Sequence, residues 1–267
     1  MAEFSARDVK NLRDATGAGM MDAKRALTES AGDPAEAAKW LRERGLGKAA
    51  ERSDRQNVEG AVAVAASGDT AALVEIKSET DFVAKSPQFV AFAEELAAAV
   101  VAEGEGAVDA RKDALDDLKL TLKENIEIGR VVRFAAAPGN VIDSYLHVQN
   151  GRGVNGVLVE LEGGSASLAH DIAVHIAFGK PSVLTRDEVS PEEVQAERAA
   201  LEAQTRNEGK PEQTVPKIVE GRLEGWYKRV PGGALVEQPF ARDDKQTVTQ
   251  VLGSAKVVRF AQAVVGS

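Results

Sequence analysis

The sequence predicts an α+β protein with three parts: an N-terminal bundle of three helices, a duplicated core of two α+β subdomains, and an antiparallel helical hairpin inserted into the second subdomain. Three observations predict this fold: helix-capping residues early in the chain, a five-residue segment that occurs twice, and a longer spacing within the second repeat. We expect the bundle at residues 1–55 and the core subdomains at 56–140 and 141–267. The hairpin is expected at about 188–228.

The first two helices of the bundle, within residues 4–45, are predicted by their ends. Ser5 and Asp8 have the spacing of a capping box, in which two side chains satisfy backbone groups at the start of a helix. Gly17 can adopt the left-handed conformation that ends a helix. A second helix is then expected to begin near Met20.

The third helix is predicted by the residues that flank it. The second helix ends before Gly32, and Asp33 and Pro34 then match the N-cap and the first position of a helix. Gly45 is expected just past the end of this third helix. The polar segment 48–57 lacks periodicity and is therefore interpreted as a linker.

The core is predicted to be duplicated because Val-Val-Arg-Phe-Ala occurs at 131–135 and again at 257–261. A predicted strand precedes each copy, at 73–76 and at 158–161. A chance match of five residues is the alternative, but the same order of elements in both halves favours a duplication. After each strand, apolar residues recur at helical spacing: Phe89, Phe92, Ala93, Leu96 and Val100 in the first half, and Leu168, Ile172 and Ile176 in the second.

The second repeat is longer because it contains an insertion. Ser190 and Pro191 begin a charged helix that runs to Gly209, Pro211 turns the chain, and a second helix runs to about Lys228. Few apolar residues line these helices, so we expect a coiled coil that projects from the body. It is either a solvated structural arm or a contact with a partner.

The composition excludes several classes of protein. The formal net charge is -9, and residues 1–55 carry eleven basic against ten acidic side chains, so no segment is basic enough for nucleic acid to be the main partner. The chain contains no cysteine, which excludes disulfides and thiolate metal sites. No apolar run could span a bilayer and the N-terminus lacks the apolar region of a signal peptide, so we expect a cytoplasmic protein that does not bind a membrane.

Few residues could carry covalent chemistry. His170 and His175 are not at the four-residue spacing that places two metal ligands on one helix face, and His175 lies among apolar neighbours like a core histidine. Gly151 and Gly153 predict a hairpin turn and not a phosphate-binding loop. We therefore expect no enzyme, no metal site and no cofactor, and we expect protein binding as the function.

Two segments could bind a partner. In segment 16–22, Met20 and Met21 are adjacent on a helix, where their side chains point about 100° apart, so a narrow core stripe favours one of them on the surface. The alternative, which the residues support equally well, is that both fill gaps in a small core. In segment 79–85, Phe82 lies on a polar connection between a strand and a helix. It can anchor a partner or fold back onto the core, and the residue pattern alone slightly favours the core.

The same two segments carry a resemblance to a known family. Thr-Gly-Ala-Gly-Met-Met-Asp at 16–22 and Thr-Asp-Phe-Val-Ala-Lys at 80–85 resemble the signature segments of bacterial elongation factor Ts. That family has a small helical (UBA-like) N-terminal domain, a two-part core and a helical hairpin, which is the partition predicted above. Further matching segments cover essentially the whole chain in order, at 142–147, 156–160, 209–211 and 218–222.

The resemblance implies a function and a partner. Elongation factor Ts is the guanine-nucleotide exchange factor of elongation factor Tu, from which it releases GDP so that GTP can bind. By resemblance, Asp81 and Phe82, with Thr80 and Val83 beside them, intrude next to the partner's Mg²⁺ site. Such a protein needs no nucleotide site of its own.

The resemblance also implies contacts outside that segment. Arg13, Met20 and Met21 match N-terminal contacts of the family, and His147 matches a position in the second subdomain that faces the partner. Some members continue into a C-terminal helix that touches the partner, and this contact is not expected here. The sequence leaves two rival functions open. One is a ribosome- or RNA-associated helical protein, against which the net charge of -9 argues, and the other is a hydrolase that uses dispersed carboxylates.

Overall fold

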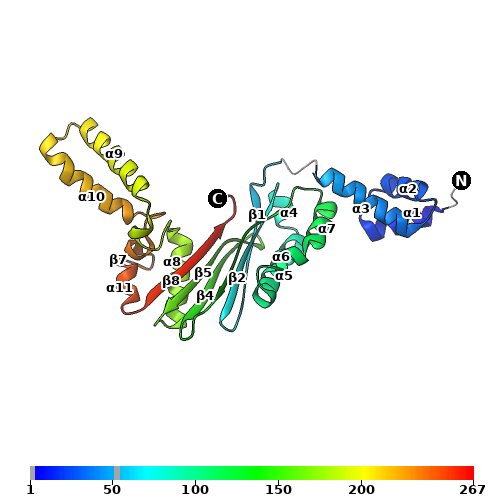
Figure 1. Ribbon diagram of the computed structural model, residues 1–267. Helices are drawn as coiled ribbons and strands as arrows, with labels where there is room; N and C mark the ends of the chain where they lie inside the picture. The colour runs from blue at the N-terminus through cyan, green and yellow to red at the C-terminus, as the bar shows by residue number, and fades with distance from the viewer. Residues whose placement is uncertain (1–3, 51–54) are drawn as a thin grey trace.

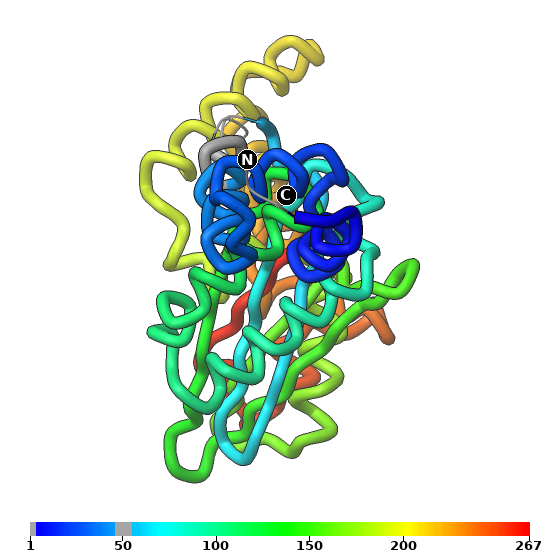
Figure 2. The backbone as a smooth tube through the Cα atoms, turned by 90° about the vertical axis from the view of Figure 1, so that its right-hand side faces the viewer, coloured from blue at the N-terminus to red at the C-terminus, as the bar shows by residue number. Residues whose placement is uncertain are grey.

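The computed structural model describes residues 4–50 and 55–267, except for the side chains of 46–50. The described part is elongated: a helical bundle lies at one end, two sheets with their helices lie in the middle, and a helical hairpin projects from the other end (Figure 1). Seen from the bundle end, the three helices of the bundle lie in front of the upper part of the core (Figure 2). The mixture of helices and antiparallel sheets confirms the α+β class.

The bundle consists of α1 (Ala6–Thr16), α2 (Met20–Glu29) and α3 (Pro34–Ala50). The predicted capping box is present, because the Ser5 side chain accepts a hydrogen bond from the Asp8 backbone and the Asp8 side chain accepts one from Ser5. Gly17 ends α1 with a φ of 67°, as predicted. The small core of the bundle is made of Val9, Leu12, Ala23, Ala26, Leu27 and Ala37.

The expected end of the third helix at Gly45 is wrong, since α3 continues to Ala50. The reason is tertiary packing: a Cβ at position 45 would lie 2.4 Å from Cδ2 of Leu120, so this glycine allows α3 to approach another helix closely. Arg42 strengthens this contact by donating a hydrogen bond of 2.6 Å to Asp117. The predicted linker therefore begins later than expected, and its residues 51–54 lie outside the described part of the chain.

The first sheet has the antiparallel order β1 (Glu59–Ser67), β2 (Thr70–Ser78) and β3 (Glu127–Ala135). Helix α5 (Pro87–Glu103) covers one face with the predicted stripe of Phe89, Phe92, Ala93, Leu96 and Val100. The remaining helices of this half are α4 (Asp81–Ala84), α6 (Ala107–Ala110) and α7 (Lys112–Leu122), and α7 is the helix that contacts α3.

The second sheet repeats this arrangement with β4 (Val141–Gln149), β5 (Arg152–Glu162) and β8 (Lys256–Val264). Helix α8 (Ala166–Gly179) follows its middle strand, as α4 and α5 follow β2. The turn between β4 and β5 is Asn150–Gly151, both with positive φ, so the predicted hairpin turn is present but Arg152 and Gly153 already belong to β5. The two sheets pack against each other through Val62, Ala71, Leu73, Phe134, Leu158, Ala261 and Ala263.

The repeated segment lies in β3 and in β8, but its phenylalanines face opposite ways. Phe134 packs between the two sheets, whereas Phe260 packs on the helix side of its sheet. The cause is a β-bulge in the second copy, where Val258 is an extra residue between Val257 and Arg259, both of which pair with β5. Since side chains alternate along a strand, one extra residue exchanges the faces of all later residues of the strand.

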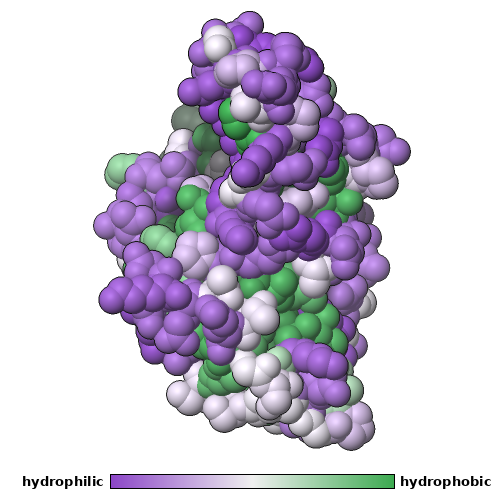
Figure 3. Space-filling model, turned by 90° about the vertical axis from the view of Figure 1, so that its left-hand side faces the viewer, coloured by the Kyte–Doolittle hydropathy of each residue, from purple (hydrophilic) through white to green (hydrophobic). Residues whose placement is uncertain are grey.

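The predicted hairpin is formed by α9 (Pro191–Asn207) and α10 (Val215–Tyr227), with a short 3-10 turn at Glu212–Thr214 between them. Figure 3 shows a mainly hydrophilic surface in the upper part of this end of the molecule, where the hairpin lies, and hydrophobic residues gathered lower on the face. The coiled coil stays a proposal, because the buried residues of α10 are spaced by four and do not alternate between three and four: Val215, Val219, Leu223 and Tyr227.

The second half contains several further short elements. They are η1 (Arg186–Glu188), η3 (Leu235–Glu237), β6 (Pro239–Phe240), β7 (Asp243–Thr247) and α11 (Val248–Leu252).

Among the described residues, no helix is long and apolar enough to cross a membrane.

Candidate partner-binding site

The segment around Phe82 forms one turn of helix, α4, between β2 and α5. Thr80 is its N-cap, and the Thr80 hydroxyl accepts a hydrogen bond of 3.4 Å from the backbone N–H of Val83. Ser86 caps α5 directly afterwards, as the sequence predicts. We call residues 80–85 the exposed turn, because the helical turn α4 is capped by Thr80 and the side chain of Phe82 is exposed to solvent.

Phe82 is 88% exposed, so the slight preference for a core position that its pattern suggested is wrong. Helical geometry gives the reason, since successive side chains of α4 point about 100° apart. Ala84 is buried and Val83 packs against the core of the first half, which leaves the Phe82 ring directed away from that core. A phenylalanine whose burial would be worth roughly 1.5–3 kcal/mol is held in water by its own turn.

Asp81 is the charged neighbour of this ring. Its carboxylate forms an ion pair with Lys85, one helical turn further on. The hydrogen bond from Lys85 lowers the pKa of Asp81, and the charge of Arg152 contributes in the same direction. Asp81 is therefore ionised at neutral pH, and the exposed turn presents a negative charge beside an aromatic ring.

The start of the exposed turn is held by hydrogen bonds to the carboxylate of Glu124, a residue that the sequence did not single out. The Glu124 carboxylate accepts hydrogen bonds from the backbone N–H groups of Glu79 and Thr80, both at 3.1 Å, and from the Thr80 hydroxyl at 2.5 Å. No spacing rule connects positions this far apart in the chain, so the contact is visible only in the folded protein.

The three N-terminal candidates are all exposed. Met20 is 47% exposed and Met21 is 75% exposed, so the alternative in which both fill gaps in the bundle core is wrong. The prediction that one methionine reaches the surface is confirmed, and the second does as well. Arg13 lies on α1 and pairs with its neighbour Asp14 at 2.7 Å. Flexible, exposed methionines are typical of surfaces that bind other proteins.

A groove of about 870 Å³ lies between this part of the bundle and α7. It is lined by the loop 17–19 between α1 and α2 and, on the other side, by Leu120 and Thr121 of α7. Because Glu124 follows α7, the same helix contacts the bundle and leads to the residue that holds the exposed turn. The structure thus connects the two signature segments through α7.

His147 lies exposed on β4 in the second sheet, opposite Asn155. The strand register places it at the same end of the core as the exposed turn. At that end Arg152 of β5 donates hydrogen bonds of 2.7 Å to the Gly60 carbonyl and 2.6 Å to Glu59 of β1. Glu59 pairs with Ser78, two residues before the turn begins.

The other two histidines, His170 and His175, contact different partners. His175 is buried, as predicted for a core histidine, and burial lowers its pKa although a hydrogen bond with Gln238 opposes that effect. His170 contacts Asp143 at 3.1 Å. Within residues 4–50 and 55–267, no three or more His, Cys, Asp or Glu side chains are arranged to hold a metal ion.

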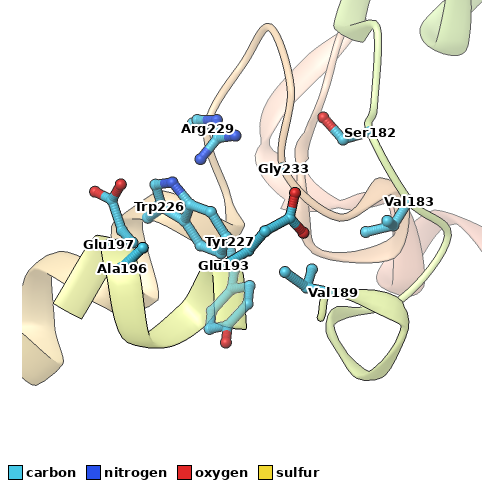
Figure 4. A pocket seen from close by; sticks show the side chains of 10 residues that line it. All are labelled: Ser182, Val183, Val189, Glu193, Ala196, Glu197, Trp226, Tyr227, Arg229 and Gly233. Atoms are coloured by element: carbon cyan, nitrogen blue, oxygen red, sulfur yellow. The ribbon is translucent and has the colours of Figure 1, made fainter. Parts of the chain in front are cut away.

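A second cavity, of about 430 Å³, lies at the base of the hairpin (Figure 4). Arg229 lies over the ring of Trp226 there, 4.5 Å from its centroid, and Glu193 and Glu197 of α9 line the same cavity. None of the candidate residues described above contributes to this cavity. The candidate site is therefore the exposed turn together with the exposed part of the bundle.

A family model and several known proteins match this chain. The family model described as Elongation factor TS matches residues 79–267. The chain is 43% identical to the Elongation factor Ts of Clavibacter michiganensis, with all of both chains covered. It is 43% identical to that of Renibacterium salmoninarum over all of both chains, and 44% identical to that of Acidothermus cellulolyticus, with all of this chain and 99% of the relative covered.

Proposed function

Since this chain belongs to the elongation factor Ts family, we propose that it binds elongation factor Tu and promotes the release of GDP from it, so that GTP can bind. The observation that carries this proposal is the position of Phe82, 88% exposed on a capped turn that is anchored to the core. A rigid aromatic side chain presented in this way has the properties of an interface hot spot.

The proposed mechanism acts on the partner's Mg²⁺ site. A divalent ion there neutralises the charge of bound phosphates, so displacing the groups that hold it weakens the affinity for nucleotide. In this proposal the ring of Phe82 wedges between side chains of the partner, and the ionised carboxylate of Asp81 enters beside it. Thr80 and Val83 fix the backbone that carries both side chains.

The proposal assigns affinity and exchange to different parts of the chain. Arg13, Met20 and Met21 bind the partner's nucleotide domain, and His147 contacts another part of the same partner. If this protein lowers the affinity of its partner for nucleotide, bound nucleotide must lower the partner's affinity for this protein by the same factor. This coupling accounts for exchange without any covalent step. We accordingly propose a non-enzymatic protein that needs no cofactor and acts in the cytoplasm, where translation takes place.

The experiment is the release of a fluorescent GDP analogue from purified elongation factor Tu, followed by stopped flow with increasing amounts of this protein. We expect the release rate to rise with concentration and then to saturate, because a complex forms before the nucleotide leaves. An equal amount of an unrelated acidic protein is the control. A release rate that stays at its spontaneous value at all concentrations contradicts the proposed function.

A further inference from the structure

We propose that Glu124 is a positioning residue for exchange: its carboxylate sets the orientation of the exposed turn and thereby the direction in which Phe82 projects. This inference rests on the proposed function, and it adds to that function a residue that contacts neither the partner nor the nucleotide.

The carboxylate of Glu124 accepts three hydrogen bonds from the segment that begins the exposed turn. Oε2 of Glu124 accepts from the backbone N–H groups of Glu79 and Thr80, at 3.1 Å each, and Oε1 accepts from the Thr80 hydroxyl at 2.5 Å. An ionised carboxylate only accepts hydrogen bonds, and the bond from the Thr80 hydroxyl, at 2.5 Å, has the short length typical of a charge-assisted bond. No uncharged side chain of the same shape can accept from all three donors.

The contact with Thr80 also determines how the turn is capped. A hydroxyl has one proton to donate and lone pairs to accept with. Because the Thr80 proton goes to Glu124, a lone pair is left for the N–H of Val83, and this is the hydrogen bond that caps α4. Glu124 therefore orients the cap, and the cap orients the helical turn that carries Phe82.

Glu124 is itself fixed by the chain on both sides. Lys123 ends α7 in the left-handed conformation, with a φ of 61°, and Ile126 is buried in the core of the first half. The neighbouring Asn125 completes a reciprocal contact, because its backbone N–H donates to the Glu79 carboxylate at 2.7 Å. Residues 79–80 and 124–125 thus hold each other by hydrogen bonds in both directions.

The same segment connects the turn with the N-terminal bundle. Glu124 follows α7, and α7 packs against α3 where Arg42 donates to Asp117 at 2.6 Å and Gly45 allows close contact with Leu120. A partner seated on the bundle is therefore held on the same base that fixes Phe82. In this arrangement the Phe82 ring keeps its position while the partner binds. A ring on a flexible turn would instead be displaced by contact with the partner.

The test is Glu124→Gln. Glutamine keeps the length and shape of the side chain, but its amide nitrogen is a donor and would face a donor of residue 79 or 80. We expect the maximal rate of GDP release to fall about tenfold, while the affinity for nucleotide-free elongation factor Tu changes by less than about threefold. Glu94→Gln, an exposed carboxylate on α5, is the matched control and should leave both quantities unchanged.

Two further measurements separate positioning from general structural damage. If Glu124 acts through the ring, Glu124→Gln should have almost no further effect on release in a Phe82→Ala background. In the free protein, deuterium uptake at the amides of 79–85 should be faster in Glu124→Gln, with the thermal midpoint close to that of the parent. Should Glu124→Gln fail to fold, Thr80→Val removes the hydroxyl, and with it both the contact with Glu124 and the cap of α4, and should lower the maximal release rate in the same way.

The outcomes distinguish the two proposals. If the unaltered protein does not stimulate release, the proposed function fails, and deuterium uptake alone still decides whether Glu124 holds the turn. If the unaltered protein is active but Glu124→Gln releases GDP at the parent rate, the positioning role is overturned and the function stands. A loss of release that is equally large with and without Phe82 also overturns the positioning role.

Discussion

The two halves of the core share their strand order but differ in the segment after the middle strand. In the first half, β2 ends at Ser78, Thr80 caps the extra turn α4, and only then does Ser86 begin the long helix α5. In the second half, Gly163 turns the chain and Ser165 caps the long helix α8 directly. The exposed turn is thus an addition to the repeated unit.

The second half has an addition of its own, the hairpin of α9 and α10, placed after α8. The two halves therefore share a similar scaffold, and each carries a different projecting segment. Binding residues are commonly found on such connections, since the scaffold fixes them while leaving their side chains free to contact a partner. The comparison locates the proposed exchange activity in the first half and predicts different responses to equivalent changes in the two halves.

The largest expected effect is that of Phe82→Ala. Removal of a hot-spot ring should slow stimulated GDP release by about 30-fold or more, equivalent to about 2 kcal/mol. Because the ring is exposed, stability should change by less than about 0.5 kcal/mol. The matched control is Phe178→Ala on α8 of the second half, where a phenylalanine that is 62% exposed loses the same atoms. Release kinetics and a thermal melt of each variant check both expectations.

Two results would contradict this prediction in different ways. A large drop of the melting temperature of Phe82→Ala, with unchanged release, would mean that the ring serves stability and not exchange. An equal loss of release in Phe178→Ala would mean that the two halves act alike, and the comparison between them would fail.

The helix boundaries of both halves were predictable because capping depends on residues within one turn. Ser86 and Ser190 each stand before a proline at the first helical turn, and each side chain accepts a hydrogen bond from the backbone as predicted. Ser5 and Gly17 delimit α1 for the same local reason. The order of strands and helices in the repeats was likewise predictable, since hydrophobic periodicity is a local property of the chain.

The features that the sequence did not reveal depend on contacts between distant segments. Gly45 ends a helix by every local rule, but it serves close packing against Leu120. Phe260 repeats Phe134 in sequence, yet a bulge turns it to the other face of its sheet. Glu124 belongs to an unremarkable polar segment until the fold places it under Thr80. The exposed residues of the candidate site were therefore predictable from the sequence. The hydrogen bonds of Glu124 that hold the turn were not, because they join residues far apart in the chain.

Shortening the hairpin should have a smaller effect than the loss of Phe82. The variant replaces residues 199–219 by a short Gly/Ser loop and keeps the base, where Arg186 lies 4.5 Å from the centroid of the Tyr227 ring and pairs with Glu224. Because the distal part buries few apolar side chains and these lie within the hairpin itself, we expect the core to fold and release to change by less than about threefold.

Circular dichroism and the GDP release assay check this prediction. A variant that loses the strand signal of the core would show that the hairpin belongs to the second scaffold. A variant that folds but loses most of its exchange activity would show that the second half contributes through its own projecting segment, so that both halves take part in exchange.

The smallest expected effect is a difference in pH dependence, because all three histidines lie in the second half. His175 is the buried one. Its Nδ1 accepts a hydrogen bond of 3.1 Å from the backbone N–H of Ala241, and its Nε2 lies 3.0 Å from Oε1 of Gln238. An amide oxygen only accepts, so Nε2 carries the proton and the ring is neutral. A second proton on Nδ1 would face the N–H of Ala241, which agrees with a pKa lowered mainly by burial.

The sign of the effect is given by linkage. In the unfolded chain His175 takes up a proton near its ordinary pKa of 6.5, whereas in the folded chain it does so only at lower pH. Stability from the neutral ring is therefore fully present above about pH 6.5 and is lost as the pH falls below it.

We expect the free energy of unfolding to decrease between about pH 7.5 and about pH 5.5, and to decrease less in His175→Gln, whatever that variant's absolute stability. Denaturant unfolding at several pH values measures both slopes. Equal slopes in His175→Gln and the parent would show that carboxylates, which are spread over both halves, set the pH dependence.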